Sequence, residues 1–352
     1  MDLRGALDYL DSHVNLESSV ARSAAAMRLD RMRRLVGLMG DPQSAYPVIH
    51  ITGTNGKGST ARMLTALLVE RGLSVGTYTS PHLERINERM AWNDEPISDD
   101  DFAETVRCVA DLEPLLGSPP THFEILTAAA YRWFADIAVD VAVVEVGLGG
   151  RWDATNVADG QVAIVTNVSL DHAEVIGPTL TQIAEEKAGI VKPGSRLVIG
   201  ETDPGLAGIF ARAGAEEVWL RGPDFGCLAN ELAHGGRRID LVTPGARYPG
   251  VYLPVHGAHQ GDNAAVAVAG AEAFFGAPLH EDVVETALGS LRLPGRLEVV
   301  ARDPLCILDG AHNPAGAAAS TAAIDEAFAV RSGKVLVVGL LAGRDPVEML
   351  DA

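Results

Sequence analysis

The sequence has little that would place it in a membrane or outside the cell. It contains no uninterrupted run of about 18 apolar residues, which a membrane-spanning helix needs. Its most apolar strand-like segment, residues 139–150, is interrupted by acidic side chains. The N-terminus is acidic where a secretory signal would be basic and then apolar. The three cysteines, Cys108, Cys227 and Cys306, are far apart and lack metal-binding spacing. We therefore expect reduced thiols in a cytoplasmic protein without a membrane partner.

Basic residues are also scarce. The chain has 28 Lys and Arg against 47 Asp and Glu, which gives a net charge of −19. This balance argues against a nucleic-acid partner, because binding to phosphate backbones needs a basic surface. An acidic protein that binds a nucleotide must instead build a local positive site from backbone amides, a few basic side chains and metal ions. With 352 residues and 47% apolar content, the chain is expected to be a globular protein of two domains.

Apolar, β-branched segments alternate with Ala-rich segments of helical period over most of the chain. This alternation predicts an α/β fold with a mainly parallel sheet covered by helices on both faces. The segment 217–256 is rich in Gly and Pro and predicts a small mixed β subregion. We expect strands at 47–53, 75–80, 139–147, 162–168 and 195–200, and helices at 59–72, 123–136, 181–191, 261–275 and 281–290.

A Pro-Gly pair within 291–300 predicts a linker between two domains, 1–294 and 295–352. The second domain should contain a strand at 305–310, a helix at 315–329 and a strand at 334–340. Two strands and one helix cannot bury both faces of a sheet. We therefore expect an incomplete, Rossmann-like α/β domain and a truncated sequence.

The segment HITGTNGKGST (50–60) is a shortened glycine-rich loop between a buried strand and a helix. The turn and the helix N-terminus direct backbone N–H groups at one point, where the helix dipole adds positive charge. Glycine lets a phosphate approach the backbone closely, a lysine supplies charge, and a hydroxyl can reach a phosphate or a metal. The alternative is a glycine-rich turn without a ligand. The predicted nucleotide-binding residues are Gly53, Thr54, Asn55, Gly56, Lys57, Gly58, Ser59 and Thr60.

This loop resembles the nucleotide loop of the Mur ligase superfamily, and most closely that of its folylpolyglutamate synthase and dihydrofolate synthase branch. Six motifs follow that branch in order from residue 28 onward, and they imply ATP and two Mg²⁺ sites. They also imply an ATPase domain of Mur-ligase type, followed by a glutamate-ligase domain that begins near residue 295.

Two further motifs follow predicted strands. TSPHLERINERM (79–90) is a polar loop at a strand's carboxyl end, where open α/β sheets bind ligands. The resemblance makes Ser80 a metal ligand and places His82 on the folate side; an ordinary solvated loop is the alternative. In EVGLGGRWDATN (145–156), Glu145 is a buried-strand carboxylate suited to Mg²⁺. The resemblance assigns Glu145 to metal and catalysis, and Arg151 and Asp153 to the pterin pocket.

In SLDHAEVIGPTLTQIAEEKAGIVKPG (169–194), the resemblance makes His172 and Lys187 catalytic and metal-binding, with Lys187 carbamylated. Each has a simpler explanation, because a lone histidine is often a core residue and Lys187 has neighbouring glutamates to pair with. THFE (121–124) resembles a dihydropteroate-binding segment through Thr121 and Phe123. Thr121 is equally suited to cap the following helix, with Glu124 completing a capping box.

The last motifs lie on both sides of the expected linker. The resemblance assigns Asn263 to the adenine base, Arg296 to the interdomain contact, and Asp309 and His312 to ribose and phosphate. The DGAHNP segment that holds the last two would by itself be a weak signal, because an ordinary strand-end turn has the same composition.

These resemblances imply ATP-driven joining of L-glutamate to dihydropteroate or a reduced folate, through an acyl phosphate. A polyglutamylation-only enzyme, a cell-wall Mur ligase, a nucleotide-hydrolysing switch and a nucleotide-binding fragment are the alternatives. We expect a monomer with no nucleic-acid partner.

Overall fold

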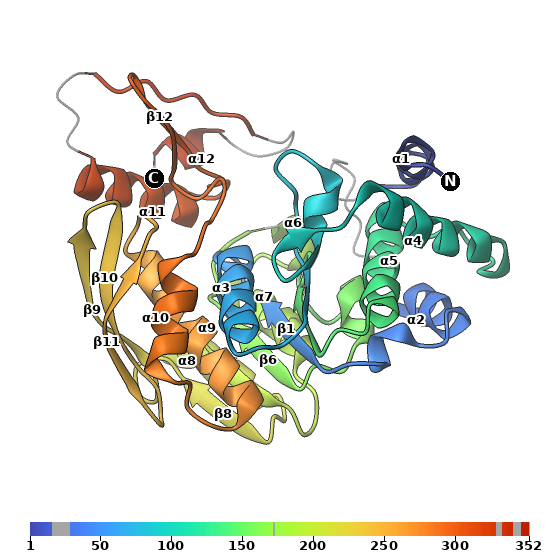
Figure 1. Ribbon diagram of the computed structural model, residues 1–352, viewed down its shortest axis with the longest axis horizontal. Coiled ribbons are helices and arrows are strands. Elements are labelled where there is room, and N and C mark those ends of the chain that lie inside the picture. The colour runs from blue at the N-terminus through green and yellow to red at the C-terminus, as the bar shows by residue number, and fades with distance from the viewer. Residues whose placement is uncertain (16–28, 172, 329–332, 341–345, 352) are drawn as a thin grey trace.

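The computed structural model describes residues 1–15, 29–171, 173–328, 333–340 and 346–351. Its centre is an eight-stranded sheet in the order β4-β3-β2-β5-β1-β6-β7-β8 (Figure 1). The run from β2 to β8 is parallel, whereas β3 and β4 extend one edge in antiparallel fashion. The strands are β1 (Val48–Thr52), β2 (Val75–Tyr78), β3 (Met90–Trp92), β4 (Glu95–Pro96), β5 (Val141–Glu145), β6 (Val162–Val165), β7 (Arg196–Ile199) and β8 (Glu217–Leu220).

Helices bury both faces of this sheet, which explains why its central strands are almost continuously apolar. In β5, Val141 and Val143 face the core built with α3, while Ala142 and Val144 face the core built with α5. The first face is covered by α3 (Lys57–Glu70), α9 (His259–Phe275) and α10 (Glu281–Gly289). The core on the opposite side involves α1 (Leu3–Asp11), α2 (Leu29–Leu38), α4 (Asp99–Leu112) and α5 (His122–Asp136), and a third cluster involves α7 (Leu180–Lys187) and α8 (Pro204–Ala211).

The predicted β subregion divides between two sheets. Its first strand, β8, joins the main sheet, whereas β9 (Gly226–Ala233), β10 (Gly236–Val242) and β11 (Arg247–Leu253) form a separate antiparallel sheet. This small sheet lies beside α9 and α10 (Figure 1). The remaining short elements are η2 (Pro42–Ser44), η3 (Ile86–Arg89), η4 (Glu113–Leu115), η5 (Ala154–Val157), α6 (Ala173–Ile176) and η6 (Ala188–Ile190).

The C-terminal part differs from the prediction in its strands. An antiparallel hairpin, β12 (Glu298–Arg302) and β13 (Leu305–Leu308), precedes α11 (Pro314–Ala327), and α12 (Pro346–Leu350) follows later. The strand predicted at 334–340 is wrong, because this segment pairs with no strand in the described part of the chain. Its Val335 and Val337 side chains are 89% and 91% exposed. A β-branched run forms a strand only beside a neighbour that accepts and donates its backbone hydrogen bonds.

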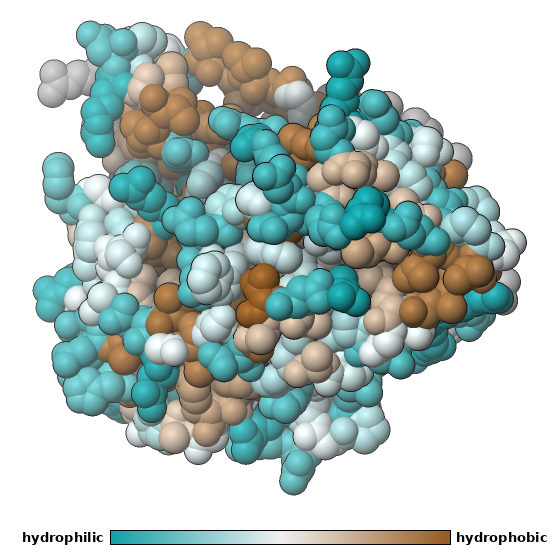
Figure 2. Space-filling model, turned by 45° about the vertical axis from the view of Figure 1, so that its right-hand side comes forward, coloured by the Kyte–Doolittle hydropathy of each residue, from teal (hydrophilic) through white to brown (hydrophobic). Residues whose placement is uncertain are grey.

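Figure 2 shows a mostly hydrophilic surface on which hydrophobic side chains gather in a few patches. Within the described ranges, no helix combines the length and the apolar character that crossing a membrane requires.

Candidate active site

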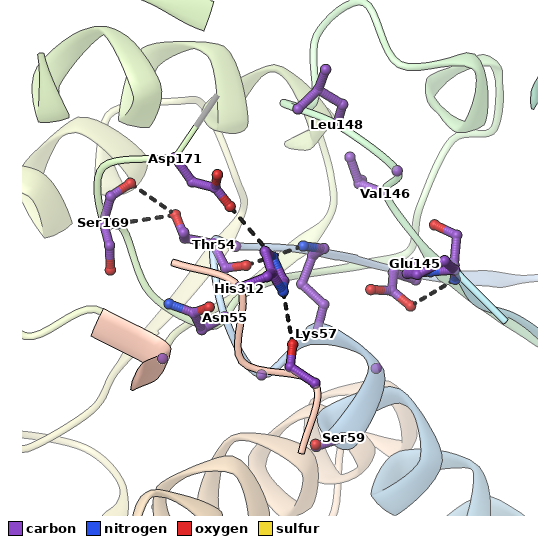
Figure 3. A pocket seen from close by; sticks show the side chains of 18 of the residues that line it. Thr54, Asn55, Lys57, Ser59, Glu145, Val146, Leu148, Ser169, Asp171 and His312 are labelled. Atoms are coloured by element: carbon purple, nitrogen blue, oxygen red, sulfur yellow. Dashed lines mark hydrogen bonds and ion pairs between the residues drawn. The ribbon is translucent and has the colours of Figure 1, made fainter. Parts of the chain in front are cut away.

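One cavity of about 790 Å³ lies where the carboxyl ends of the central parallel strands meet the C-terminal segment (Figure 3). This is the position at which open α/β sheets bind ligands, and the size suits a nucleotide-sized ligand. Its wall includes most of the residues singled out from the sequence: Gly53, Thr54, Asn55, Gly56, Lys57, Gly58, Ser59, Ser80, Thr121, Phe123, Glu145, Asp153, Lys187, Asn263, Arg296, Asp309 and His312.

The glycine-rich loop turns sharply from β1 into α3 and is held from the end of β6. The backbone N–H of Thr54 donates to the carbonyl oxygen of Asn167 at 2.9 Å, and that of Asn55 donates to Asn167 Oδ1 at 2.9 Å. The Thr166 hydroxyl donates to the carbonyl oxygen of Asn55 at 2.6 Å. These bonds hold the loop backbone against the end of β6.

Gly56 ends the loop in a conformation that favours glycine, with φ at +82°. A Cβ atom there would lie 2.5 Å from Oδ1 of Asn263, which α9 places against the loop. Gly56 also provides no side-chain cap for α3. The first N–H groups of a helix have no partner within the helix, so this end of α3 suits a phosphate group.

Lys57 and Ser59 lie in the first turn of α3 and line the cavity, with Lys57 Nζ 3.3 Å from the carbonyl oxygen of Thr54. Thr60 is fully buried and does not line the cavity.

Glu145 ends β5 and is 4% exposed. Its Oε2 accepts a hydrogen bond of 3.1 Å from the backbone N–H of Ser80. Burial raises the pKa of this carboxyl, and the nearby positive charge of Lys57 opposes that rise. A Cβ atom at Gly58 would lie 3.5 Å from the same oxygen, so the carboxylate faces the first turn of α3.

The oxygen atoms of Glu145 and Ser80 fit a hard cation such as Mg²⁺. Within the described residues, no three His, Cys, Asp or Glu side chains gather closely enough to hold a metal. An ion at this point would therefore take its other ligands from phosphate oxygens and water, as Mg²⁺ commonly does in nucleotide sites.

Lys187, at the end of α7, points into the cavity rather than pairing with its neighbouring glutamates. Its Nζ donates to the carbonyl oxygen of Gly53 at 2.8 Å, and the side chain is buried. Burial, together with the charge of Lys57, lowers the pKa of Lys187 to about 7. Glu186 instead accepts from the backbone N–H of Trp152 at 3.2 Å. His172, the other residue singled out in this motif, lies outside the described residues.

Thr121, Phe123 and Asp153 form another part of the wall. Thr121 caps α5, and Glu124 completes the capping box, so the structural interpretation of Thr121 is confirmed while the residue also lines the cavity. The carboxylate of Asp153 accepts backbone N–H groups from Leu148 at 2.8 Å and Thr155 at 3.0 Å. Asp153 therefore shapes its own loop as well as facing the cavity.

The C-terminal segment supplies the remaining wall. Asp309 accepts from the backbone N–H of Leu297 at 2.9 Å and from the Ser320 hydroxyl at 2.6 Å. His312 Nε2 lies 3.6 Å from Oδ2 of Asp171, and both side chains line the cavity (Figure 3). The segment therefore contacts the loop that follows β6.

Two predicted substrate residues do not line the cavity. His82 Nδ1 accepts from Arg89 Nε at 2.9 Å, and the half-exposed Arg151 lies 4.0 Å from Glu186. Conversely, Asn167, Ser169 and Asp171 line it without having been singled out. They come directly after β6, so the rule that ligands bind at strand carboxyl ends was the signal available for finding them.

Comparisons with known proteins identify relatives of this chain. Residues 115–271 match the Mur ligase middle domain. The dihydrofolate synthase/folylpolyglutamate synthase of Mycobacterium tuberculosis is 40% identical, over 91% of this chain and 72% of its own. The folylpolyglutamate synthase of Lacticaseibacillus casei is 37% identical, over 91% of this chain and 77% of its own.

Solved structures show the same likeness. The M. tuberculosis folylpolyglutamate synthase complexed with ADP and AMPPCP superposes with a TM-score of 0.85 and 40% identity, covering 94% of this chain and 74% of its own. An FPGS-AMPPCP-folate complex superposes with a TM-score of 0.90 and 33% identity, covering 100% and 86%. The α/β fold of Mur-ligase type is thereby confirmed, and the chain belongs to the dihydrofolate synthase/folylpolyglutamate synthase family.

Proposed function

We propose that this protein is an ATP-dependent ligase that joins L-glutamate to the carboxylate of a pterin or folate, acting on both dihydropteroate and reduced folates. The observation that carries the proposal is the shared cavity. It brings the glycine-rich loop (50–60) together with Thr121, Phe123 and Asp153, the residues that the motifs place on the pterin side. The related structures that hold ADP, AMPPCP and folate support this use of the cavity.

The chemistry explains why both groups must meet in one space. A carboxylate is a poor acyl electrophile, so one of its oxygens first bonds to the γ-phosphorus of ATP while the bond to ADP breaks. The nitrogen of L-glutamate then attacks the acyl carbon, phosphate leaves, and the nitrogen loses a proton. Lys57 and the N–H groups at the start of α3 hold the transferred phosphoryl group, so positioning and electrostatics supply most of the acceleration.

Two magnesium sites belong to this proposal. Ser80 and Glu145 would hold one ion, and Glu145, His172 and Lys187 as a carbamate would hold the second. When bound, Mg²⁺ neutralises the repulsion between phosphate and carboxylate oxygens. A carbamate forms from a neutral amine, and the lowered pKa of Lys187, about 7, supports that modification.

The finer assignments follow the motifs. Asn263 would contact adenine, and Arg296, Asp309 and His312 would contact ribose and phosphate. His82 and Arg151 would act on the substrate side after a rearrangement, since neither lines the cavity here. We also propose a cytoplasmic monomer divided into residues 1–294 and 295–352, whose closure excludes water from the reaction.

The test is phosphate release from ATP and Mg²⁺ by the complete protein, with dihydropteroate, tetrahydrofolate and L-glutamate supplied singly and in pairs. Mass spectrometry would identify the products. Release that requires a pterin together with glutamate, and adds a glutamyl mass to both pterins, is the expected result. Addition to tetrahydrofolate alone would favour a polyglutamylation-only enzyme. Release that ignores both co-substrates would refute the ligase and favour a simple nucleotide hydrolase.

A further inference from the structure

Asn313 connects three separate parts of the chain through one buried side chain. It lies just before α11, is 2% exposed, and is not among the residues singled out from the sequence. Its Nδ2 donates to Asn55 Oδ1 in the glycine-rich loop at 2.9 Å and to Asp171 Oδ2 at 3.2 Å. Its Oδ1 accepts from the backbone N–H of Gly316 at 2.9 Å and from Asn55 Nδ2 at 3.3 Å.

These bonds use both donors and both acceptor positions of the carboxamide, which is the full capacity of the group. The bond from Gly316 also sets the orientation of the amide, because a carbonyl oxygen must face that N–H to cap α11. An aspartate could keep the cap but would lose both donors. A serine could keep the cap but would not replace the reciprocal pair with Asn55. The arrangement therefore depends on asparagine itself.

The loop does not need Asn313 to keep its own shape. Its backbone at Asn55 is held by Thr166 and Asn167, at 2.6 and 2.9 Å, from the end of β6. The bonds of the Asn55 side chain described here run instead to Asn313. This pair therefore joins the loop to α11 rather than stabilising the loop.

We propose that Asn313 is a positioning residue that holds the C-terminal wall, with Arg296, Asp309 and His312, against the nucleotide loop during the reaction. The proposal rests on the ligase function given above. Asn313 joins the wall to the nucleotide loop through its carboxamide pair with Asn55, and to the loop after β6 through its bond to Asp171, which His312 also approaches. The wall carries only part of the proposed nucleotide contacts, and the glycine-rich loop carries the rest. Weakening the junction should therefore slow the reaction by a larger factor than it weakens nucleotide binding.

The test compares Asn313→Asp and Asn313→Ser with the unchanged protein. Both variants retain an oxygen that can cap α11, and the aspartate also brings a carboxylate beside Asp171. We expect kcat to fall by roughly 10- to 100-fold, from the loss of two or three hydrogen bonds, one of them to a charged group. The Kd for AMPPCP should rise by a smaller factor than kcat falls, because the loop backbone keeps its own hydrogen bonds and only the wall's contacts with the nucleotide are weakened.

Two controls separate positioning from simple destabilisation. Ser98→Ala removes the N-cap of α4 at a residue that does not line the cavity, and should lower stability without changing kcat. Asn55→Ala combined with Asn313→Ser should be about as slow as Asn313→Ser alone, because Asn313→Ser already removes the contact through which the Asn55 side chain acts.

Turnover by the unchanged protein tests the ligase function, and turnover by the two Asn313 variants tests the positioning role separately. If the unchanged protein does not join glutamate to a pterin, the ligase proposal fails. If it does, and both Asn313 variants turn over normally, the positioning role is refuted. A parallel loss of AMPPCP affinity and kcat, or additive effects in the double variant, would also refute it.

Discussion

The Nζ atom of Lys187 lies 2.8 Å from the carbonyl oxygen of Gly53, so a helix that follows β6 reaches the first glycine of the nucleotide loop. Lys57 approaches the same loop from α3, at 3.3 Å from the carbonyl oxygen of Thr54. Two lysines near one loop repel each other, and this repulsion adds to burial in lowering the pKa of Lys187 to about 7. The site therefore holds one amine, that of Lys187, whose pKa lies near neutral, close to the amine of Lys57.

Lys187 should form a carbamate in bicarbonate buffer as the pH rises from 6 to 8. With a pKa of about 7, its neutral fraction grows from roughly a tenth to nine tenths over this interval. Carbon-13 NMR with labelled bicarbonate would detect the adduct. The signal can be assigned readily because the sequence has only four lysines. Lys187→Gln is the control, and a signal of equal strength in that variant would assign the adduct elsewhere.

Replacing Glu145 by glutamine should abolish most turnover while preserving the fold. The substitution removes a negative charge from a side chain that is 4% exposed, so it relieves a desolvation cost and should leave the melting temperature unchanged or higher. Loss of the carboxylate should lower kcat by roughly 100-fold or more, since it removes the proposed ligand of the Mg²⁺ ion that would screen phosphate charge. Phosphate release and thermal unfolding would be measured on the same sample. Turnover near that of the unchanged protein would remove Glu145 from the catalytic site.

Gly56→Ala should weaken nucleotide binding through a specific clash. The new Cβ would lie 2.5 Å from Asn263 Oδ1, in addition to the cost of φ at +82°. We expect the Kd for AMPPCP to rise roughly tenfold or more, measured by calorimetry. Gly72→Ala is the matched control, because Gly72 has φ at +90° and no atom within 4 Å of the added Cβ. It should cost about 1 kcal/mol of stability and leave the affinity unchanged. Equal affinity losses in both variants would point to backbone strain alone.

Because of His50, the free energy of unfolding should decrease as the pH falls below 6.5, the ordinary pKa of a histidine side chain. It is fully buried on β1, with Nε2 2.8 Å from the Thr155 hydroxyl, and burial lowers its pKa from 6.5 to about 3. Between these values the unfolded chain takes up a proton that the folded chain does not. The contribution of His50 is therefore present above pH 6.5 and is lost toward pH 3, by at most about 1.4 kcal/mol per pH unit.

Urea unfolding at several pH values would measure this slope, and His50→Gln should flatten it. Titration of the carboxyl groups is common to both proteins, so the difference between the two curves isolates the histidine. Parallel curves would show that His50 has the same pKa in the folded and unfolded states, and so would contradict the prediction.

Local patterns were enough to predict the central elements of the fold. The five strands expected between 47 and 200 all belong to the main sheet, and the helices expected at 59–72, 123–136 and 261–275 correspond to α3, α5 and α9. These segments are long and strongly periodic. Burial of the apolar face of each segment offsets the conformational entropy that is lost when the segment becomes ordered. The same local patterns failed at 334–340, where an apolar run has no neighbouring strand in the described structure.

The candidate site shows the same division. Residues in the glycine-rich loop and at the ends of predicted strands, such as Lys57 and Glu145, could be singled out because spacing and chemistry coincide there. Asn313 could not be predicted in this way. Its four hydrogen bonds run to Asn55, which is 258 positions away in the sequence, to Asp171, which is 142 positions away, and to Gly316 in its own helix. Nor could the sequence show that His82 faces Arg89, outside the cavity wall.

The sequence by itself thus determined the alternation of strands and helices, the motifs at strand ends and the family to which they belong. Periodicity and turn chemistry act over a few residues, so they can be recognised along the chain. Only the tertiary structure decided which of those residues share a cavity, which lysine is buried enough to lose its proton near neutral pH, and which asparagine joins the loop to α11. Those properties depend on burial and on contacts between distant segments, which exist only once the chain has folded.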